Sequence, residues 1–99
     1  MAIEQKLLNK VKTSLRISHS VLDEDLTDIV EACLADLKVC GVPEPKADDP
    51  LILNAIKLYS KAAYTDDTEK AAAYQARYDA LKSCLMMASG YREEAVASD

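Results

Sequence analysis

Residues 23–40 carry the pattern that most constrains the fold, a row of apolar side chains at the spacing of an α-helix. Apolar residues recur at intervals of three and four, which places them along one helical face. The row consists of Leu26, Ile29, Val30, Cys33, Leu34 and Leu37. Ser20 or Asp23 can cap the start of this helix. Gly41 suits the left-handed position after its end, and Pro43 prevents its continuation. We therefore expect an amphipathic helix that needs a core to pack on.

Three further segments show the same helical period. They cover about Ile3 to Leu15, the residues that follow Asp49-Pro50, and about Thr68 to Ala88. Asp49 is expected to be the N-cap of its helix and Pro50 the first helical residue. The sequence thus predicts an all-α fold, a small four-helix bundle-like domain over residues 1–91. A flexible polar tail is expected at residues 92–99.

The segment from Leu51 to Tyr64 is apolar on most sides of its predicted helix. Its apolar side chains cannot all face one neighbour, and they include Leu51, Leu53, Ile56, Leu58, Tyr59, Ala62 and Ala63. A helix of this kind is either central in a bundle or shared with another subunit. Both alternatives stay open at the level of sequence.

Composition narrows the class of protein further. The 99 residues are 49% hydrophobic, which supports one domain with a packed core. The net charge of −5 argues against a tight nucleic-acid binder, which needs a basic face. The longest apolar runs fall short of the roughly 18 residues that span a bilayer, and the first residues lack the apolar core of a signal peptide. We therefore expect a cytoplasmic protein with no membrane partner.

The sequence predicts no catalytic residues, no cofactor and no metal site. His19 is the single histidine, and two glycines cannot build a phosphate-binding loop. Cys33, Cys40 and Cys84 are expected to be small core or interface residues. The acidic run at residues 23–31 is explained by the preference of a helix start for negative charge.

Charge is segregated along the chain. Residues 3–17 hold four basic side chains and one acidic one, whereas residues 23–38 hold six acidic side chains and one basic one. The two regions attract each other either weakly within one monomer or between neighbouring copies, head to tail. The five tyrosines serve either the core or a subunit interface. The candidate interface residues are Lys12, Arg16, Asp25, Asp28, Leu58, Tyr59, Tyr74 and Tyr78.

Several of these residues resemble a known family. Lys12, Leu15, Arg16 and Ile17, followed by Asp23, Asp25, Leu26, Ile29 and Ala32, resemble the opening of the small head–tail connector, or adaptor, proteins of tailed phages. Asp49-Pro50-Leu51, Ala55-Ile56 and Tyr59 resemble that family's third helix, and residues 81–91 resemble its closing segment. The resemblance covers roughly residues 8–91.

The resemblance implies a non-enzymatic, all-α subunit that assembles as a homo-oligomeric ring, usually twelve-fold. Such a ring joins the portal protein to a tail-side or stopper protein in the virion, after assembly in the host cytoplasm. Double-stranded DNA passes through its channel without specific binding. Many relatives carry an aromatic residue and an Arg-Glu pair after the third helix, where this chain has Tyr64-Thr65-Asp66-Asp67.

A second hypothesis stays open beside the connector. The chain can also be a small helical regulator that binds a protein partner as a dimer. In that case the apolar segment that follows Pro50 would form the two-fold interface.

Overall fold

The computed structural model describes residues 5–42, 45–46 and 49–87, and within them the chain forms four α-helices and no strand. The helices are α1 (Gln5–Leu15), α2 (Asp23–Val39), α3 (Pro50–Tyr64) and α4 (Thr68–Met87). The all-α expectation is confirmed, with helix ends close to those predicted. Ile3, Pro43, Ala88 and the tail at 92–99 lie outside the described residues.

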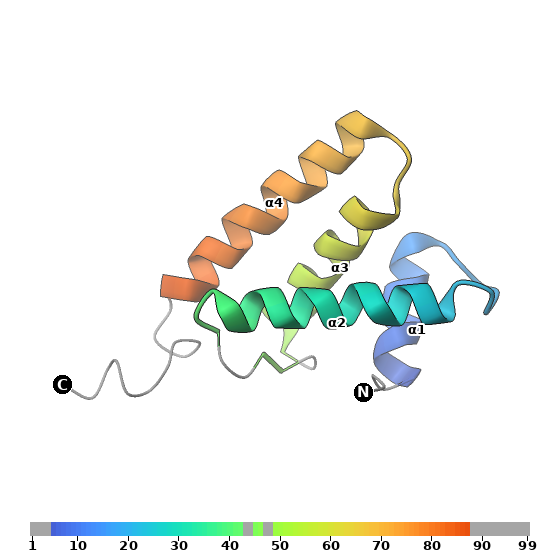
Figure 1. Ribbon diagram of the computed structural model, residues 1–99, viewed down its shortest axis with the longest axis horizontal. Helices are drawn as coiled ribbons and strands as arrows, with labels where there is room; N and C mark the ends of the chain where they lie inside the picture. Colours follow the sequence, from blue (N-terminus) through green and yellow to red (C-terminus); the bar gives the residue numbers. More distant parts are fainter. Residues whose placement is uncertain (1–4, 43–44, 47–48, 88–99) are drawn as a thin grey trace.

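Helix α3 is the centre of the molecule. α3 and α4 lie side by side as a hairpin, and α2 runs across the first half of α3 (Figure 1). α1 packs against both α2 and α3. Of the two alternatives left open for this apolar helix, the central position is confirmed, since α1, α2 and α4 all pack against it, while Leu51 and Tyr64 stay exposed.

The main core forms where α2, α3 and α4 meet. Ile52, Ala55 and Ile56 of α3 are fully buried, and Leu58 and Tyr59 are half-buried against the same core. The other buried members come from the remaining helices and from the loop that follows α2: Leu7, Val11, Val30, Cys33, Leu37, Val42, Tyr78 and Leu85. Burial of this apolar surface is the main driving force for the fold.

Two helix ends follow the sequence prediction. The Asp49 carboxylate accepts a hydrogen bond from the Leu51 N–H at 2.9 Å, with Pro50 as the first helical residue. At the end of α2, Gly41 has φ +108°, and the Val42 N–H donates to the Leu37 carbonyl at 2.9 Å. This is the Schellman arrangement, which requires a left-handed residue that glycine adopts without strain.

The predicted side-chain cap of α2 is wrong. Leu22 occupies the N-cap position and makes no side-chain hydrogen bond, while Ser20 offers only its backbone carbonyl to the Asp23 N–H. The Asp23 carboxylate instead lies 2.7 Å from the Lys12 ammonium group of α1. This ion pair joins the end of α1 to the start of α2, where negative charge is also favoured by the helix dipole.

The turn between α1 and α2 contains a residue with a left-handed backbone conformation. Arg16 is the one non-glycine residue with positive φ among those described, at +62°. Its N–H donates to the Thr13 carbonyl, and the Ile17 N–H donates to the Lys12 carbonyl at 2.9 Å, again the Schellman arrangement. The turn sends Ile17 into a second, smaller apolar cluster with Leu8 and Leu26. A side chain in the left-handed region costs roughly 1–2 kcal/mol, so Arg16 is strained.

Replacement of Arg16 by glycine should stabilise the fold. Relief of the strain outweighs the extra flexibility of glycine in the unfolded chain, so Arg16→Gly should raise the free energy of unfolding by about 0.5–1 kcal/mol. Urea denaturation measures this change. The matched control is Lys10→Gly, at an exposed helical position of α1, which should lose about 1 kcal/mol. Equal losses in both variants would contradict the strain at Arg16.

Candidate functional site

The side chains with functional chemistry gather at two places. One is a polar cluster between α2 and α4, and the other is a hollow where the end of α1 meets the turn between α3 and α4. The two differ in chemistry, because the first is a hydrogen-bonded network within the fold and the second is open to solvent.

The polar cluster centres on the Asp36 carboxylate of α2. The Tyr78 hydroxyl of α4 donates to Asp36 Oδ2 at 2.7 Å, and the Lys82 ammonium donates to the same oxygen at 3.0 Å. Lys82 also lies 5.2 Å from the centroid of the Tyr78 ring, whose edge packs against Tyr59 with centroids 5.1 Å apart. The Cys33 sulfur lies 3.9 Å from the Tyr78 hydroxyl. The cluster thereby ties together two helices that both pack on α3.

The protonation states of the cluster suit structure rather than catalysis. The Tyr78 hydrogen bond, together with the Lys82 charge, holds the pKa of Asp36 below its ordinary value of 3.8. Burial raises the pKa of the Cys33 thiol to about 12, and burial with the Asp36 bond raises the pKa of Tyr78. Near neutral pH the thiol and phenol thus keep their protons while the carboxylate is charged. A thiol nucleophile or a general base needs a pKa much closer to 7.

This cluster also corrects one predicted interface residue. Tyr78 is completely buried inside the monomer. Its ring fills the core and its hydroxyl is bound by Asp36, so it presents no surface to a second subunit. Sequence spacing placed Tyr78 on the same helix as Tyr74 but could not tell which side of α4 faces α2.

Loss of the Asp36 charge should weaken the fold in a pH-dependent way. Because the pKa of Asp36 is lowered on folding, its stabilisation is complete above its ordinary value of 3.8 and is lost as the pH falls through the folded-state pKa. Asp36→Asn should reduce the free energy of unfolding at pH 7 by about 1–2 kcal/mol, the contribution of hydrogen bonds to a partly exposed charge. The variant should also lose less stability than the wild type on acidification.

Urea denaturation between pH 3 and pH 7 provides the measurement. Asp79→Asn is the control, since Asp79 is an exposed carboxylate on α4 that accepts a hydrogen bond from the exposed Gln75 side chain at 3.0 Å and lies outside the buried core. An acid-induced loss of stability in Asp36→Asn as large as in the wild type would contradict the assignment.

The hollow lies at the C-terminal end of α3, beside the turn that leads into α4. It has a volume of about 560 Å³. Its lining combines three cations with two tyrosines and one carboxylate. The residues are Ser14, Leu15 and Arg16 from the end of α1, Lys61, Tyr64, Thr65 and Asp66 from the end of α3 and its turn, and Lys70 and Tyr74 from α4. Lys61 Nζ lies 5.7 Å from the centroid of the Tyr74 ring.

The structure brings only two of the predicted interface residues, Arg16 and Tyr74, into this hollow. Lys12 is buried and paired with Asp23 of its own chain, so it offers no free charge to a neighbour. Leu58 and Tyr59 pack partly against the core.

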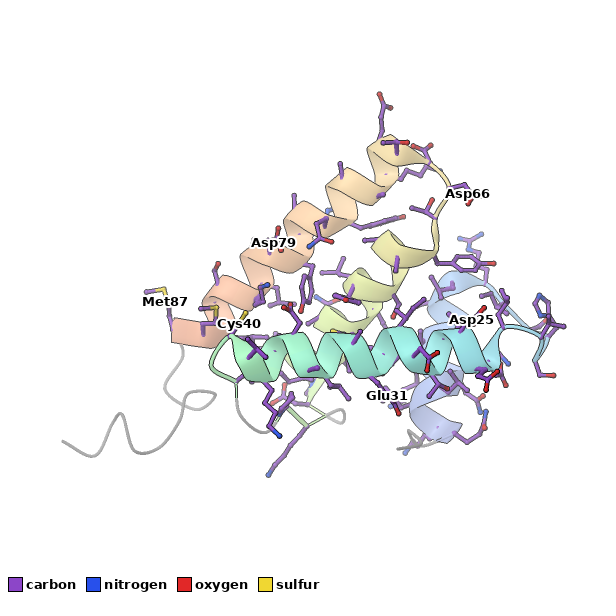
Figure 2. The ribbon with its side chains drawn as sticks, in the orientation of Figure 1. Asp25, Glu31, Cys40, Asp66, Asp79 and Met87 are labelled. Atoms are coloured by element: carbon purple, nitrogen blue, oxygen red, sulfur yellow. The ribbon has the colours of Figure 1, made fainter. Side chains whose placement is uncertain are left out.

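Asp25 and Asp28 are both exposed near the start of α2. Figure 2 shows Asp25 and Asp66 toward one end of the molecule, and Cys40 and Met87 toward the opposite end. The predicted acidic surface is therefore on the same end of the molecule as the hollow.

A second basic feature lies between α1 and α3. The residues that line this shallow groove are Lys6, Asn9, Lys10, Thr13 and Lys57. The described residues hold eleven basic and eleven acidic side chains, so the net charge of −5 resides in the remaining segments of the sequence. Positive charge thus gathers on the α1–α3 side, and negative charge at the start of α2.

The hollow contains residues outside the predicted interface set, although Tyr64 was among the five tyrosines assigned to either the core or an interface. Lys61, Tyr64 and Lys70 join Arg16 only because α1 packs against α3 and α4 returns beside it. Val21 was also missed, although it is 83% exposed in the loop before α2. A valine next to the polar stretch Ser18-His19-Ser20 was the one signal in the sequence that could have identified it.

Two further findings concern the part of the chain that the structure describes. No group of three or more His, Cys, Asp or Glu side chains in it is arranged to hold a metal ion. Nor is any of its helices both long and apolar enough to cross a membrane.

The fold defines a class of protein, a small all-α domain of four helices. Residues 7–92 match the phage connector protein family, and the chain belongs to that family. No curated protein and no solved structure matches the chain significantly. Family membership gives the protein a structural, connector-type role and places it in the phage virion.

Proposed function

We propose that this protein is a head–tail adaptor subunit that forms a ring, twelve-fold as the family resemblance implies, beneath the portal protein. The family match over residues 7–92 is the observation that carries the proposal. Subunits are made in the host cytoplasm, dock on the portal and then receive a tail-side or stopper protein. The subunit catalyses no reaction in this process. Its role is to join the head to the tail.

The distribution of charge supports head-to-tail contacts between copies. Arg16 lies in a hollow with two further cations, whereas Asp25 and Asp28 are exposed at the start of α2. A contact between two different surfaces of identical subunits generates a ring when the rotation closes. Lys12 takes no part, because its ion pair with Asp23 is internal.

The proposal also constrains how the ring meets DNA. Double-stranded DNA slides through a channel that lacks phosphate-binding cations, since each such contact strengthens binding. A lysine-lined groove that faced the channel in every subunit would bind the DNA phosphates and retain the duplex. We therefore orient the groove formed by Lys6, Lys10 and Lys57 away from the channel. The surplus negative charge of the whole chain further opposes retention of the duplex.

The dimeric-regulator hypothesis has less support. It relied on the apolar surface of α3, and much of that surface is buried against α1, α2 and α4 within the monomer, which leaves Leu51 and Tyr64 exposed. No specific structural feature favours it over the connector.

Co-sedimentation with purified portal rings tests the proposal. Wild-type protein should pellet with the portal, appear as an added ring in electron micrographs, and bind less strongly as the salt concentration rises. Reversal of both acids, Asp25→Lys with Asp28→Lys, should weaken retention about tenfold, equivalent to about 1.4 kcal/mol. Arg77→Glu, a charge reversal at an exposed position of α4, is the control and should retain normal binding. Absence of portal binding by the folded wild-type protein would contradict the proposal.

A further inference from the structure

We propose that the Val21 loop of one copy inserts into the hollow of a second copy. We define the Val21 loop as residues 17–22, and the hollow as the cavity lined by Arg16, Tyr64, Lys70 and Tyr74 with their neighbours. The proposal rests on the self-assembly proposed above and names the two surfaces that meet.

The Val21 loop presents an apolar side chain beside negative charge. Val21 is 83% exposed, and the exposed carboxylates of Glu24, Asp25 and Asp28 follow it in the first turns of α2. The loop forms the outermost point of its end of the molecule (Figure 1). A protruding valine surrounded by acids is suited to a cavity with an apolar wall and a positive rim.

The Val21 loop is held in place on both sides. Before it, Ile17 is buried against Leu8 and Leu26. After it, Leu22 packs on the same cluster and Asp23 pairs with Lys12 at 2.7 Å. These anchors fix the loop without covering Val21. A pre-ordered loop loses little conformational entropy when it binds, which favours affinity.

The hollow has the complementary chemistry. The Tyr64 and Tyr74 rings and Leu15 offer apolar surface, and Arg16, Lys61 and Lys70 outnumber the one acid, Asp66. Its volume of about 560 Å³ lies within the range of protein binding cavities. Tyrosine and arginine are the side chains that most often dominate binding energy at interfaces.

The backbone of Arg16 provides an independent indication. Arg16 occupies a left-handed position that glycine would adopt without strain, yet its side chain lines the hollow. Strain of this kind gathers at sites that bind or react.

The occupant must come from another molecule. Val21 is almost fully exposed in the monomer, so the loop does not fill the hollow of its own chain. A second copy supplies both the apolar side chain and the acids within eight residues of sequence. The Val21 loop and the hollow, both exposed on a free subunit, are then covered by one type of contact between neighbouring copies.

Disulfide trapping on portal-bound protein tests the contact. In a Cys40→Ser, Cys84→Ser background, subunits with Val21→Cys are mixed with tagged subunits that carry Lys70→Cys, and a mixed disulfide should form. The native Cys33 is buried and should form no disulfide. The matched control replaces Lys70→Cys by Met87→Cys, since Met87 is 78% exposed but lies at the opposite end of the molecule (Figure 2). This control should give no mixed disulfide.

Two milder variants separate assembly from folding. Val21→Ser and Arg16→Gly should each weaken self-association on the portal about tenfold, while Arg16→Gly melts at a higher temperature than the wild type. Rings that form at wild-type strength in both variants, or equal trapping at positions 70 and 87, would overturn this docking and leave the adaptor function intact. A wild-type protein that never assembles on the portal would overturn both.

Discussion

The left-handed turn at Arg16 is the feature on which the rest of the structure depends. It ends α1 and sends Ile17 into the small cluster with Leu8 and Leu26. The turn thereby brings the start of α2 beside Lys12, where Asp23 completes the ion pair. The same turn leaves Val21 exposed and places the Arg16 side chain in the hollow. A single backbone conformation thus connects the core to the two surfaces proposed for assembly.

The core of the molecule is formed within one chain. α3 packs against three helices, and the Asp36 cluster ties α4 to α2 over the same core. The proposed assembly on the portal requires a subunit of this kind, because a template raises the local concentration of subunits that already have a complete core. In the proposed ring, weak contacts between neighbouring subunits would be repeated around the circle and add up to a stable assembly.

The sequence predicted those features that local chemistry determines. Apolar periodicity located all four helices, and Asp49-Pro50 and Gly41 marked helix ends correctly. The sequence did not predict contacts between residues that lie far apart in the chain. Asp23 looked like a cap but pairs with Lys12, and Tyr78 looked available but is buried beside Asp36. The hollow could not be foreseen, because its walls come from three helices whose packing is a tertiary property.

Cryo-electron microscopy of the protein bound to its portal tests the central claim most directly, namely that the folded monomer assembles in a circle through this end of the molecule. The account predicts a closed ring of subunits with the fold described above, in which residues 17–28 of each copy contact the hollow of its neighbour. Subunits bound as separate monomers or as two-fold dimers, with the hollow open to solvent, would contradict it.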